Sequence, residues 1–416
     1  MFSFIKKLDK PDRRVLTACF LLFVSSGFLA LTMGSSLPAL SDAYQLSDSF
    51  SGLLLSFHSA GNLLAGLVSG LIPVYLGQKR SIILLSSLGF LGYSLITMTG
   101  VPALLAAAFF IIGFGRGSIT NFTNRQANLL SGGSPAATNL LHACFAVGAI
   151  IAPLLFHALS TTVSWRAGIF AVVLICVAVW GNLFRIRIKN DRMNRKDKTN
   201  TTLVFLKNPS FLILVGMMFC YLASEYAVNG WLVTYIQSRE ELLSALTAGG
   251  MTLSAFSQMM ATLLWTVMLT GRLICAAIAP KVGQKKLMMF ASFGMALFYA
   301  LMLRAPSVAL VAVSVAGLGL CMAGICPMIY SDAAIFTNAY PLATSFLLAL
   351  GSLGGIVMPT LVGALADRSG FSAGMGAIFV TIVLLVVFSV LNVTVPTRKP
   401  EQSSESWISP KKSTAV

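Results

Sequence analysis

Glu225 is the one acidic residue placed well inside a long apolar stretch of this sequence. Tyr221 and Asn229 lie four residues to either side of it, so a helix would put all three on one face. A carboxylate held away from water at such a depth can bind a proton reversibly near neutral pH. The pattern predicts a proton carrier or an anchor for a polar ligand. The alternative is a structural carboxylate held by a neighbouring arginine or hydroxyl group.

Arg116 is a basic residue midway along another apolar stretch, and Thr120 and Thr123 share its face at helical spacing. A guanidinium group keeps its charge, so it needs a partner in an apolar setting. Two interpretations stay open. Arg116 either clamps a carboxylate or phosphate of a ligand, or pairs with Glu225. A ligand or proton that broke such a pair would favour one of two conformations over the other.

Five further polar side chains are candidates for binding a small molecule. His142 and His58 can titrate near pH 7, although a histidine that is hydrogen-bonded inside a helix bundle is the commoner case. Asn62 lies four residues after His58 on the same helical face. Asn121 and Asn124 either donate hydrogen bonds to a ligand or join neighbouring helices.

The stretch around residues 252–275 carries Gln258, Trp265 and Arg272 at helical spacing. An aromatic ring that stacks on a sugar and an amide that binds hydroxyls would suit a carbohydrate, and core packing is the alternative. Arg272 lies near the end of its stretch, where we expect gating or snorkelling to the interface. Trp231 and Tyr235 are expected in an aromatic belt at the opposite interface.

The elements that must position these residues are membrane-spanning helices. The chain has 416 residues, a mean hydropathy of +0.84 and only 10% charged residues, which is too little polar surface for a water-soluble protein. Apolar stretches of about 20 residues predict helices that cross the bilayer, and hence an all-α membrane protein. The twelve expected spans are 15–39, 50–73, 81–99, 103–128, 136–159, 167–184, 210–236, 252–275, 287–303, 307–329, 341–364 and 373–394.

The net charge of +16 is distributed asymmetrically between the connections. One side of the membrane would carry 23 of the 29 lysines and arginines. The other side would carry Arg166, Arg239, Arg304 and Arg368. The positive-inside rule then predicts that both termini lie in the cytoplasm. We expect the protein in the plasma membrane. We also expect its basic residues to interact with the lipid bilayer and not with nucleic acid. No cleavable signal peptide is evident.

The spans divide into two halves joined by a basic segment. The expected parts are a cytoplasmic start (1–14), a six-helix bundle (15–184), a basic linker (185–209), a second six-helix bundle (210–394) and a polar tail (395–416). All seven cysteines fall in apolar spans and none has metal-type spacing. We therefore expect no metal and no cofactor, with a proton gradient as the energy source.

Two basic turns occupy equivalent places in the two halves, 206 residues apart. They read Gly77-Gln78-Lys79-Arg80 and Gly283-Gln284-Lys285-Lys286. A repeat of this length predicts two similar bundles that face each other across a pathway. The residues expected to take part in gating are Gly77, Lys79, Arg80, Arg272, Gly283, Lys285 and Lys286.

These turns resemble the cytoplasmic turns of the major facilitator superfamily, which read Gly-x-Leu-Ala-Asp-Arg-x-Gly-Arg-Lys. The first copy matches at Gly70, Gly77, Lys79 and Arg80, and the second at Gly283, Lys285 and Lys286. The resemblance implies two pseudo-symmetric bundles and alternating access. The acid of the family pattern is replaced by Val74 and Pro280. The resemblance gives that acid a role in latching the bundles, so the latch here must differ.

Longer motifs resemble the fucose-permease-like branch of that superfamily. They are Gly113–Gly117 with the two asparagines after it, Leu141–Pro153, Glu225–Tyr235 and Gly324–Pro327. This resemblance implies symport of a sugar with a proton. A sugar permease of the branch would carry an acidic residue in its first helix, and the first span here has none.

The sequence favours a secondary transporter over an enzyme. It has no Gly-x-Ser-x-Gly turn, zinc-type histidine cluster or phosphate-binding loop, so catalysis and ATP-driven transport lack support. The leading hypothesis is proton-coupled uptake of a sugar or similar small polar solute. The alternatives are transport of an organic anion, zwitterion or short peptide with Arg116 and Glu225, or efflux of amphipathic compounds. A monomer is expected, as the family's usual form.

Overall fold

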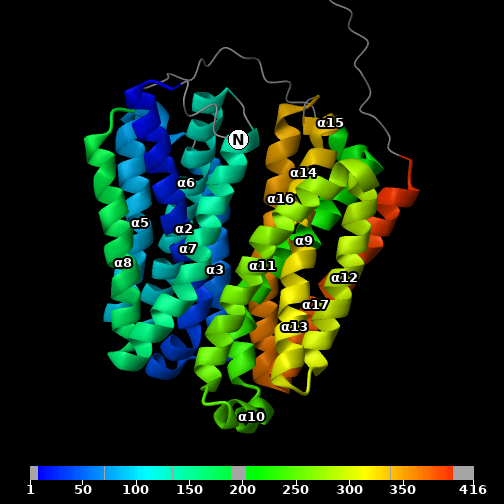
Figure 1. Cartoon of the computed structure of the whole chain (residues 1–416). Helices are drawn as coiled ribbons and strands as arrows, with labels where there is room; N and C mark the ends of the chain where they lie inside the picture. Colours follow the sequence, from blue (N-terminus) through cyan, green and yellow to red (C-terminus); the bar gives the residue numbers. More distant parts are fainter. Residues whose placement is uncertain (1–7, 70, 133–134, 189–202, 338, 397–416) are drawn as a thin grey trace, which may run out of the picture.

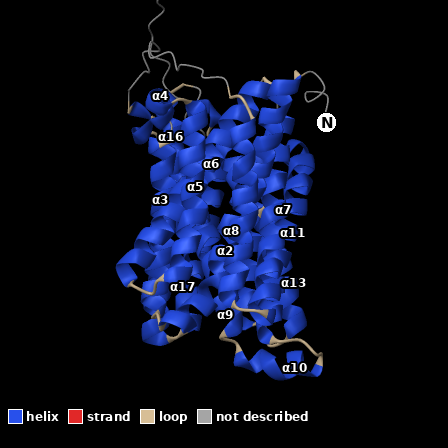
Figure 2. Ribbon diagram, turned by 90° about the vertical axis from the view of Figure 1, so that its left-hand side faces the viewer, coloured by secondary structure: helices blue, strands red, loops and turns tan. Residues whose placement is uncertain are grey.

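The chain folds into long helices that run roughly parallel through the molecule (Figure 1). The computed structural model describes all residues except 1–7, 70, 133–134, 189–202, 338 and 397–416. Within the described part there are helices and loops, without strands, as Figure 2 shows. Gly70, which was matched to the family's turn, lies outside the described residues. So do most of the basic linker and most of the tail.

The first bundle contains six long helices. They are α2 (Lys10–Tyr44), α3 (Asp48–Val68), α5 (Gln78–Met98), α6 (Pro102–Ser131), α7 (Pro135–Thr162) and α8 (Trp165–Gly181). Short helices at its edges are α4 (Ile72–Leu76) and η1 (Asn182–Arg185), whereas η2 (Val204–Lys207) packs against α9 of the second bundle. Inside the bundle, α2 packs against α7, and α6 packs against both α3 and α5.

The second bundle repeats this plan. Its long helices are α9 (Pro209–Gln237), α11 (Leu253–Val282), α12 (Gln284–Arg304), α13 (Val308–Met322) continued by α14 (Ile325–Asp332), α16 (Pro341–Ser369) and α17 (Phe371–Thr394). The short ones are η3 (Glu240–Leu242), α10 (Leu243–Ala248) and α15 (Ala334–Thr337). Eleven of the described helices are long and apolar enough to cross a membrane. The remaining long helix of the two bundles is α3, which carries His58 and Asn62 among its apolar residues. The predicted all-α membrane fold of two six-helix bundles is confirmed.

The ends of several helices differ from the predicted spans. The first helix runs over Lys10–Tyr44 where the prediction was 15–39, and α16 continues to Ser369 where the prediction ended at 364. Hydropathy marks only the apolar part of a helix, whereas backbone hydrogen bonds continue through polar ends. The tenth span is interrupted between α13 and α14, near Gly324.

The two basic turns have the same backbone in both bundles. Gly77 (φ 78°) and Gly283 (φ 89°) each end one helix and begin the next, in a conformation that favours glycine. The Nζ of Lys79 donates to the carbonyl of Phe184 at 2.9 Å. The Nζ of Lys285 donates to the carbonyl of Asn392 at 3.1 Å. Each turn is thus tied to the last helix of its own bundle. We call the end of the molecule with these turns the basic end, and the end with α10 the opposite end (Figure 1).

The bundles meet where α2 packs on α9, α3 on α16 and α7 on α11. Glycines bring backbones into direct contact toward the opposite end. A Cβ atom added to Gly52 would lie 2.4 Å from the carbonyl oxygen of Pro359, and one added to Gly363 would lie 2.1 Å from that of Asp48. Neither position can accept a larger residue without a backbone shift, so α3 and α16 are closely fitted there.

Hydrogen bonds reinforce this contact between α3 and α16. The carboxylate of Asp367 accepts from the backbone amides of Asp48 (2.9 Å) and Ser49 (2.8 Å), the first residues of α3. These amides have no partner within their own helix, so a carboxylate of the other bundle satisfies them. The Oγ of Ser56 donates to the carbonyl of Ile356 and lies 2.7 Å from the Oγ1 of Thr360.

Candidate functional site

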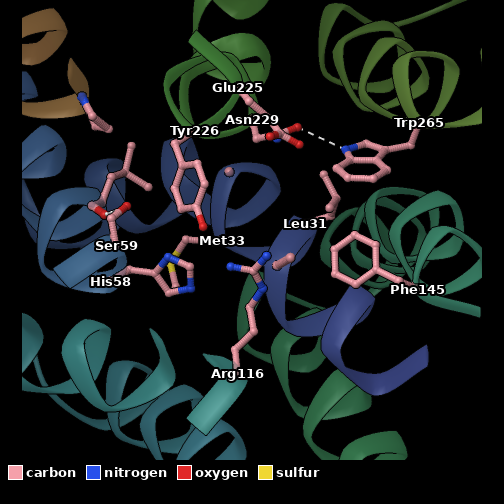
Figure 3. A pocket seen from close by; sticks show the side chains of 15 residues that line it. Leu31, Met33, His58, Ser59, Arg116, Phe145, Glu225, Tyr226, Asn229 and Trp265 are labelled. Atoms are coloured by element: carbon pink, nitrogen blue, oxygen red, sulfur yellow. Dashed lines mark hydrogen bonds between the residues drawn. The ribbon is translucent and has the colours of Figure 1, made fainter. Parts of the chain in front are cut away.

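A cavity of about 60 Å³ lies at the centre of the contact between the bundles. That volume has room for a few water molecules, since one water needs about 10–15 Å³ on such a measure. Figure 3 shows side chains from both bundles pointing into it. The lining residues are Ala30, Leu31, Met33, Gly34, Leu55, His58, Ser59, Arg116, Phe145, Glu225, Tyr226, Asn229, Gly230, Trp265 and Pro359. Sequence reasoning selected five of them: His58, Arg116, Glu225, Asn229 and Trp265.

Arg116 enters the cavity from α6 of the first bundle. Its guanidinium carbon lies 5.7 Å from the centre of the Phe145 ring, and its Nε is buried without a hydrogen-bond partner. The close contact of α6 with α3 positions it, because the neighbouring Gly113 and Gly117 let the two helices touch. A buried donor with a fixed charge and no acceptor is costly. Arg116 is therefore available to an anionic group in this cavity.

Glu225 enters the same cavity from α9 of the second bundle (Figure 3). The ion pair with Arg116 that one interpretation predicted is not formed. In the described part of the chain, the only ion pair within 4 Å joins Arg239 to Glu241 in the loop after α9. The site thus brings a carboxyl group from one bundle and a guanidinium group from the other to one space, without an ion pair between them.

An aromatic wall closes one side of the cavity. The indole Nε1 of Trp265 donates to the Oδ1 of Asn229 at 3.0 Å, which orients both side chains (Figure 3). The ring of Phe145 lies 5.2 Å from that of Trp265, across the contact between α7 and α11. The Arg272 guanidinium carbon lies 5.9 Å from the Trp265 ring. This wall offers an aromatic face and an amide to a ligand.

A polar group forms the other side of the cavity. The Nε2 of His58 is buried without a hydrogen-bond partner. The Nδ2 of Asn62 donates at 3.1 Å to the hydroxyl of Tyr226, so this bond joins the two bundles beside the cavity. Tyr226 and Ser59 were missed from the sequence. The one signal in the sequence was that they directly follow Glu225 and His58. Helical spacing does not select them, because adjacent residues of a helix do not share a face.

Comparisons with known proteins agree with this two-bundle arrangement around a central site. The family model of the Major Facilitator Superfamily matches residues 15–274, which is more than half of the chain. The chain belongs to the Major Facilitator Superfamily. It is a membrane transporter and not an enzyme, as the names of its relatives also indicate. Transport by this fold exposes a central site alternately to the two sides of the membrane.

Several individual proteins are similar to this facilitator over most of its length. The membrane protein MosC of Rhizobium meliloti is 25% identical over 394 residues, covering 91% of this chain and 89% of MosC. An uncharacterized MFS-type transporter of Yersinia pestis is 22% identical, covering 82% and 86%. The crystal structure of the nucleoside transporter NupG superposes with a TM-score of 0.72 at 14% identity, covering 92% and 98%. The human organic anion transporter MFSD10 gives 0.61 at 16%, covering 92% and 100%. At these identities the solved structures show the shared fold alone.

The other predicted binding residues of the facilitator do not line the cavity. Gln258 donates to the carbonyl of Ser35 at 2.9 Å and so ties α11 to α2. The ring of His142 packs edge-on against Phe23 at 5.4 Å. Helical spacing placed them on polar faces, but those faces meet neighbouring helices.

Asn121 and Asn124 also have protein partners. The Nδ2 of Asn121 donates to the carbonyl of Ala65 (3.2 Å) and to the Oγ of Ser69 (3.0 Å), which joins α6 to α3. The Nδ2 of Asn124 donates to the carbonyl of Thr120 in its own helix. Of the two alternatives for Asn121, the structure therefore shows the hydrogen bond between helices.

The residues predicted for gating lie at the basic end, with one exception. Arg80 and Lys286 are exposed there, beside the bonded Lys79 and Lys285. Arg272 points away from that end, toward Met268 and Trp265, so the expected snorkelling is wrong. A helical side chain points toward the start of its helix, and α11 starts at the opposite end.

The aromatic belt expected at Trp231 and Tyr235 is also wrong. Both side chains are almost fully buried, and the Nε1 of Trp231 donates to the carbonyl of Pro359 at 3.1 Å. The hydroxyl of Tyr235 donates to the carbonyl of Leu303. They pack between helices of the protein because α9 is surrounded by α2, α16 and α17.

Proposed function

We propose that this facilitator transports a small polar solute that carries an anionic group, in exchange for or together with protons bound by Glu225. The observation that carries the proposal is the buried, unpartnered Nε of Arg116 in a cavity that Glu225 also lines. An anionic group bound there would remove the cost of the unpaired guanidinium. A zwitterion would engage both charges at once. No other cofactor is needed, since a carboxylate can carry the proton.

Each charge comes from a different bundle, which connects binding to alternating access. A solute that contacts Arg116 on α6 and Glu225 on α9 would draw the two bundles together. Protonation of Glu225 would instead weaken its attraction to Arg116 and Arg272 and release that restraint. A ligand changes such an equilibrium only by its different affinity for the two states, and the separated charges offer that difference.

Proton-coupled uptake of a sugar is the second candidate function. The observation in its favour is the Trp265 ring, held by Asn229 at the edge of the cavity. A ring of this kind stacks on the face of a sugar, and the nearby amide serves its hydroxyls. The similarity to a nucleoside transporter and the resemblance to the fucose-permease-like branch support it. The third candidate, efflux of amphipathic compounds, draws on the many apolar residues of the lining.

Uptake by the purified protein in vesicles tests these candidates. Labelled organic acids, amino acids, short peptides, sugars and nucleosides are offered with and without an inward proton gradient. We expect uptake of an anionic or zwitterionic solute that Arg116→Gln reduces about thirtyfold or more, as removal of a charged hydrogen bond implies. Arg125→Gln, on the same helix but outside the cavity, is the matched control. Sugar uptake that Arg116→Gln leaves unchanged would favour the second candidate.

Proton coupling and orientation have separate tests. Uptake that an inward proton gradient still drives in Glu225→Gln would exclude Glu225 as the proton carrier. For orientation, we propose that the basic end faces the cytoplasm of a plasma-membrane protein, because its charge agrees with the positive-inside rule. A reporter fused after Lys198 should therefore be cytoplasmic, and an external reporter would reverse the orientation. We propose a monomer, which light scattering of the purified protein checks.

A further inference from the structure

A second cavity, of about 530 Å³, lies at the basic end between the start of α2 and the end of α8. Four cationic side chains line it: Lys10, Arg13 and Arg14 from α2, and Arg185 from η1. No acidic residue of the described part of the chain is among the lining residues. This cavity belongs to the first bundle alone, so it is separate from the central site.

The four cations have no acidic partner in the part of the chain that the structure describes. None of them forms an ion pair with a described acid. Two acids lie at the start of the helix, the N-cap Asp9 and Asp12 in the first turn, and the Asp9 carboxylate accepts the backbone amide of Asp12. The cavity also lies at the N-terminal end of a 35-residue helix, where the backbone dipole adds positive potential. Four like charges around one concave space repel one another, and an anion bound there would relieve the repulsion.

The lower edge of the cavity is apolar. It is lined by Ala18 and Leu21 of α2, which lie further along the helix than the cations, and by Ile186. The Leu21 side chain is 40% exposed. Leu21 follows Arg14 by seven residues, which is about 10 Å along a helix. The polar headgroup layer of one leaflet is only about 5–8 Å thick, so Leu21 reaches the hydrocarbon when Arg14 lies at the headgroups. The cavity thus combines a phosphate-binding rim with a wall for an acyl chain.

We propose that this cavity binds the phosphate headgroup of an anionic phospholipid, with an acyl chain along Leu21. Basic pockets between helices at a membrane surface have the chemistry to recognise such headgroups. A free phosphate ion shares the anionic chemistry but would make no use of the apolar edge. The proposal is independent of what the central site transports.

Native mass spectrometry of the full chain, titrated with phosphatidylglycerol, tests the proposal. We expect the double variant Arg14→Gln/Arg185→Gln to bind the lipid at least about tenfold more weakly than the parent, since two charge-assisted contacts are lost. Lys207→Gln/Lys281→Gln is the matched control. It removes two exposed charges that do not line the cavity. It should bind the lipid as the parent does.

The conservative variant Arg14→Lys/Arg185→Lys keeps the charge and should retain most of the affinity, which separates loss of the site from loss of the fold. Equal binding by Arg14→Gln/Arg185→Gln and the parent would overturn the proposal. An equal loss in the control pair would also overturn it, because general surface charge would then explain the binding. Displacement of the lipid by millimolar inorganic phosphate would assign the cavity to a soluble anion, against the proposal.

Discussion

The two ends of the contact between the bundles are held in different ways. At the opposite end, backbones touch at Gly52 and Gly363, and Asp367 of one bundle caps α3 of the other. At the basic end, the two turns share one backbone geometry, but each serves its own bundle, because Lys79 and Lys285 bind carbonyls of their own bundles. The hydrogen bonds between the bundles that are described above begin beside the cavity, with the bond from Asn62 to Tyr226. The others lie between there and the opposite end.

This difference shows where the bundles are joined and where they are independent. A transporter must exchange one closed end for the other, so the bonds of the closed end have to be breakable. The opposite end meets this need with short polar contacts and glycine packing, which can be lost together when α3 and α16 separate. The family's turns carry an acid where this chain has Val74 and Pro280, at the basic end. Here the acid that joins the bundles is Asp367, at the opposite end.

Two pairs of spin labels in a cysteine-free background would measure the two ends. Ala43→Cys on α2 with Ser369→Cys on α16 reports the opposite end. Leu129→Cys on α6 with Val282→Cys on α11 reports the basic end. All four positions are exposed. The predictions below concern the share of molecules in which each end is closed.

The largest effect is expected from Gly363→Ala. The added methyl group would overlap the backbone of Asp48, and overpacking of this kind costs about 1–3 kcal/mol. The closed share of the opposite end should fall about tenfold or more, seen as a longer distance between labels 43 and 369. Gly376→Ala is the control, because a methyl group there would meet no atom within 4 Å. An unchanged distance in Gly363→Ala would show that the contact yields without opening.

A smaller effect is expected from Asp367→Asn. The substitution removes the charge that two amides of α3 contact, at a cost of about 1.5 kcal/mol, or roughly tenfold at most. The same label pair measures it. Asp332→Asn is the matched control at the basic end, where that carboxylate accepts from Asn392 inside the second bundle. The cap has no role in closure if both variants behave alike.

Ser56→Ala should have a milder effect in the same direction. It removes the hydroxyl that joins α3 to Ile356 and Thr360, which is worth about 1 kcal/mol, or roughly fivefold in the closed share. Ser94→Ala, which removes a bond inside α5 only, is the comparison. Equal responses of the two variants would show that the bonds of Ser56 to α16 do not stabilise the closed opposite end.

The smallest effect is expected at the basic end from Val74→Asp. Val74 is 57% exposed, and a carboxylate there restores the acid of the family's turn. Exposed ion pairs contribute about 0–1 kcal/mol, so labels 129 and 282 should approach with less than about a fivefold change in population. Val74→Asn separates charge from polarity. If Asp and Asn shift the distance equally, a charged latch is not the cause.

Much of the architecture was predictable from the sequence. Hydropathy located the spans, and the spacing of Gly77 and Gly283 predicted the two equivalent turns. Of the predicted binding residues, Arg116, Glu225, Asn229, Trp265 and His58 line one cavity. Asn121 and Gln258 show the limit, since a polar residue on a helix serves a ligand or a neighbouring helix according to which helix it faces.

The sequence by itself determined the helices, their two halves and the charged end, because hydrophobic length, capping and charge count are local properties of the chain. The tertiary structure alone decided which faces meet. It brought Arg116 and Glu225 to one cavity without pairing them, buried Trp231, and placed Asp367 on the amides of Asp48 and Ser49, more than 300 residues away. Helices in lipid associate through close packing and a few polar contacts, and these depend on the relative rotation and depth of whole helices.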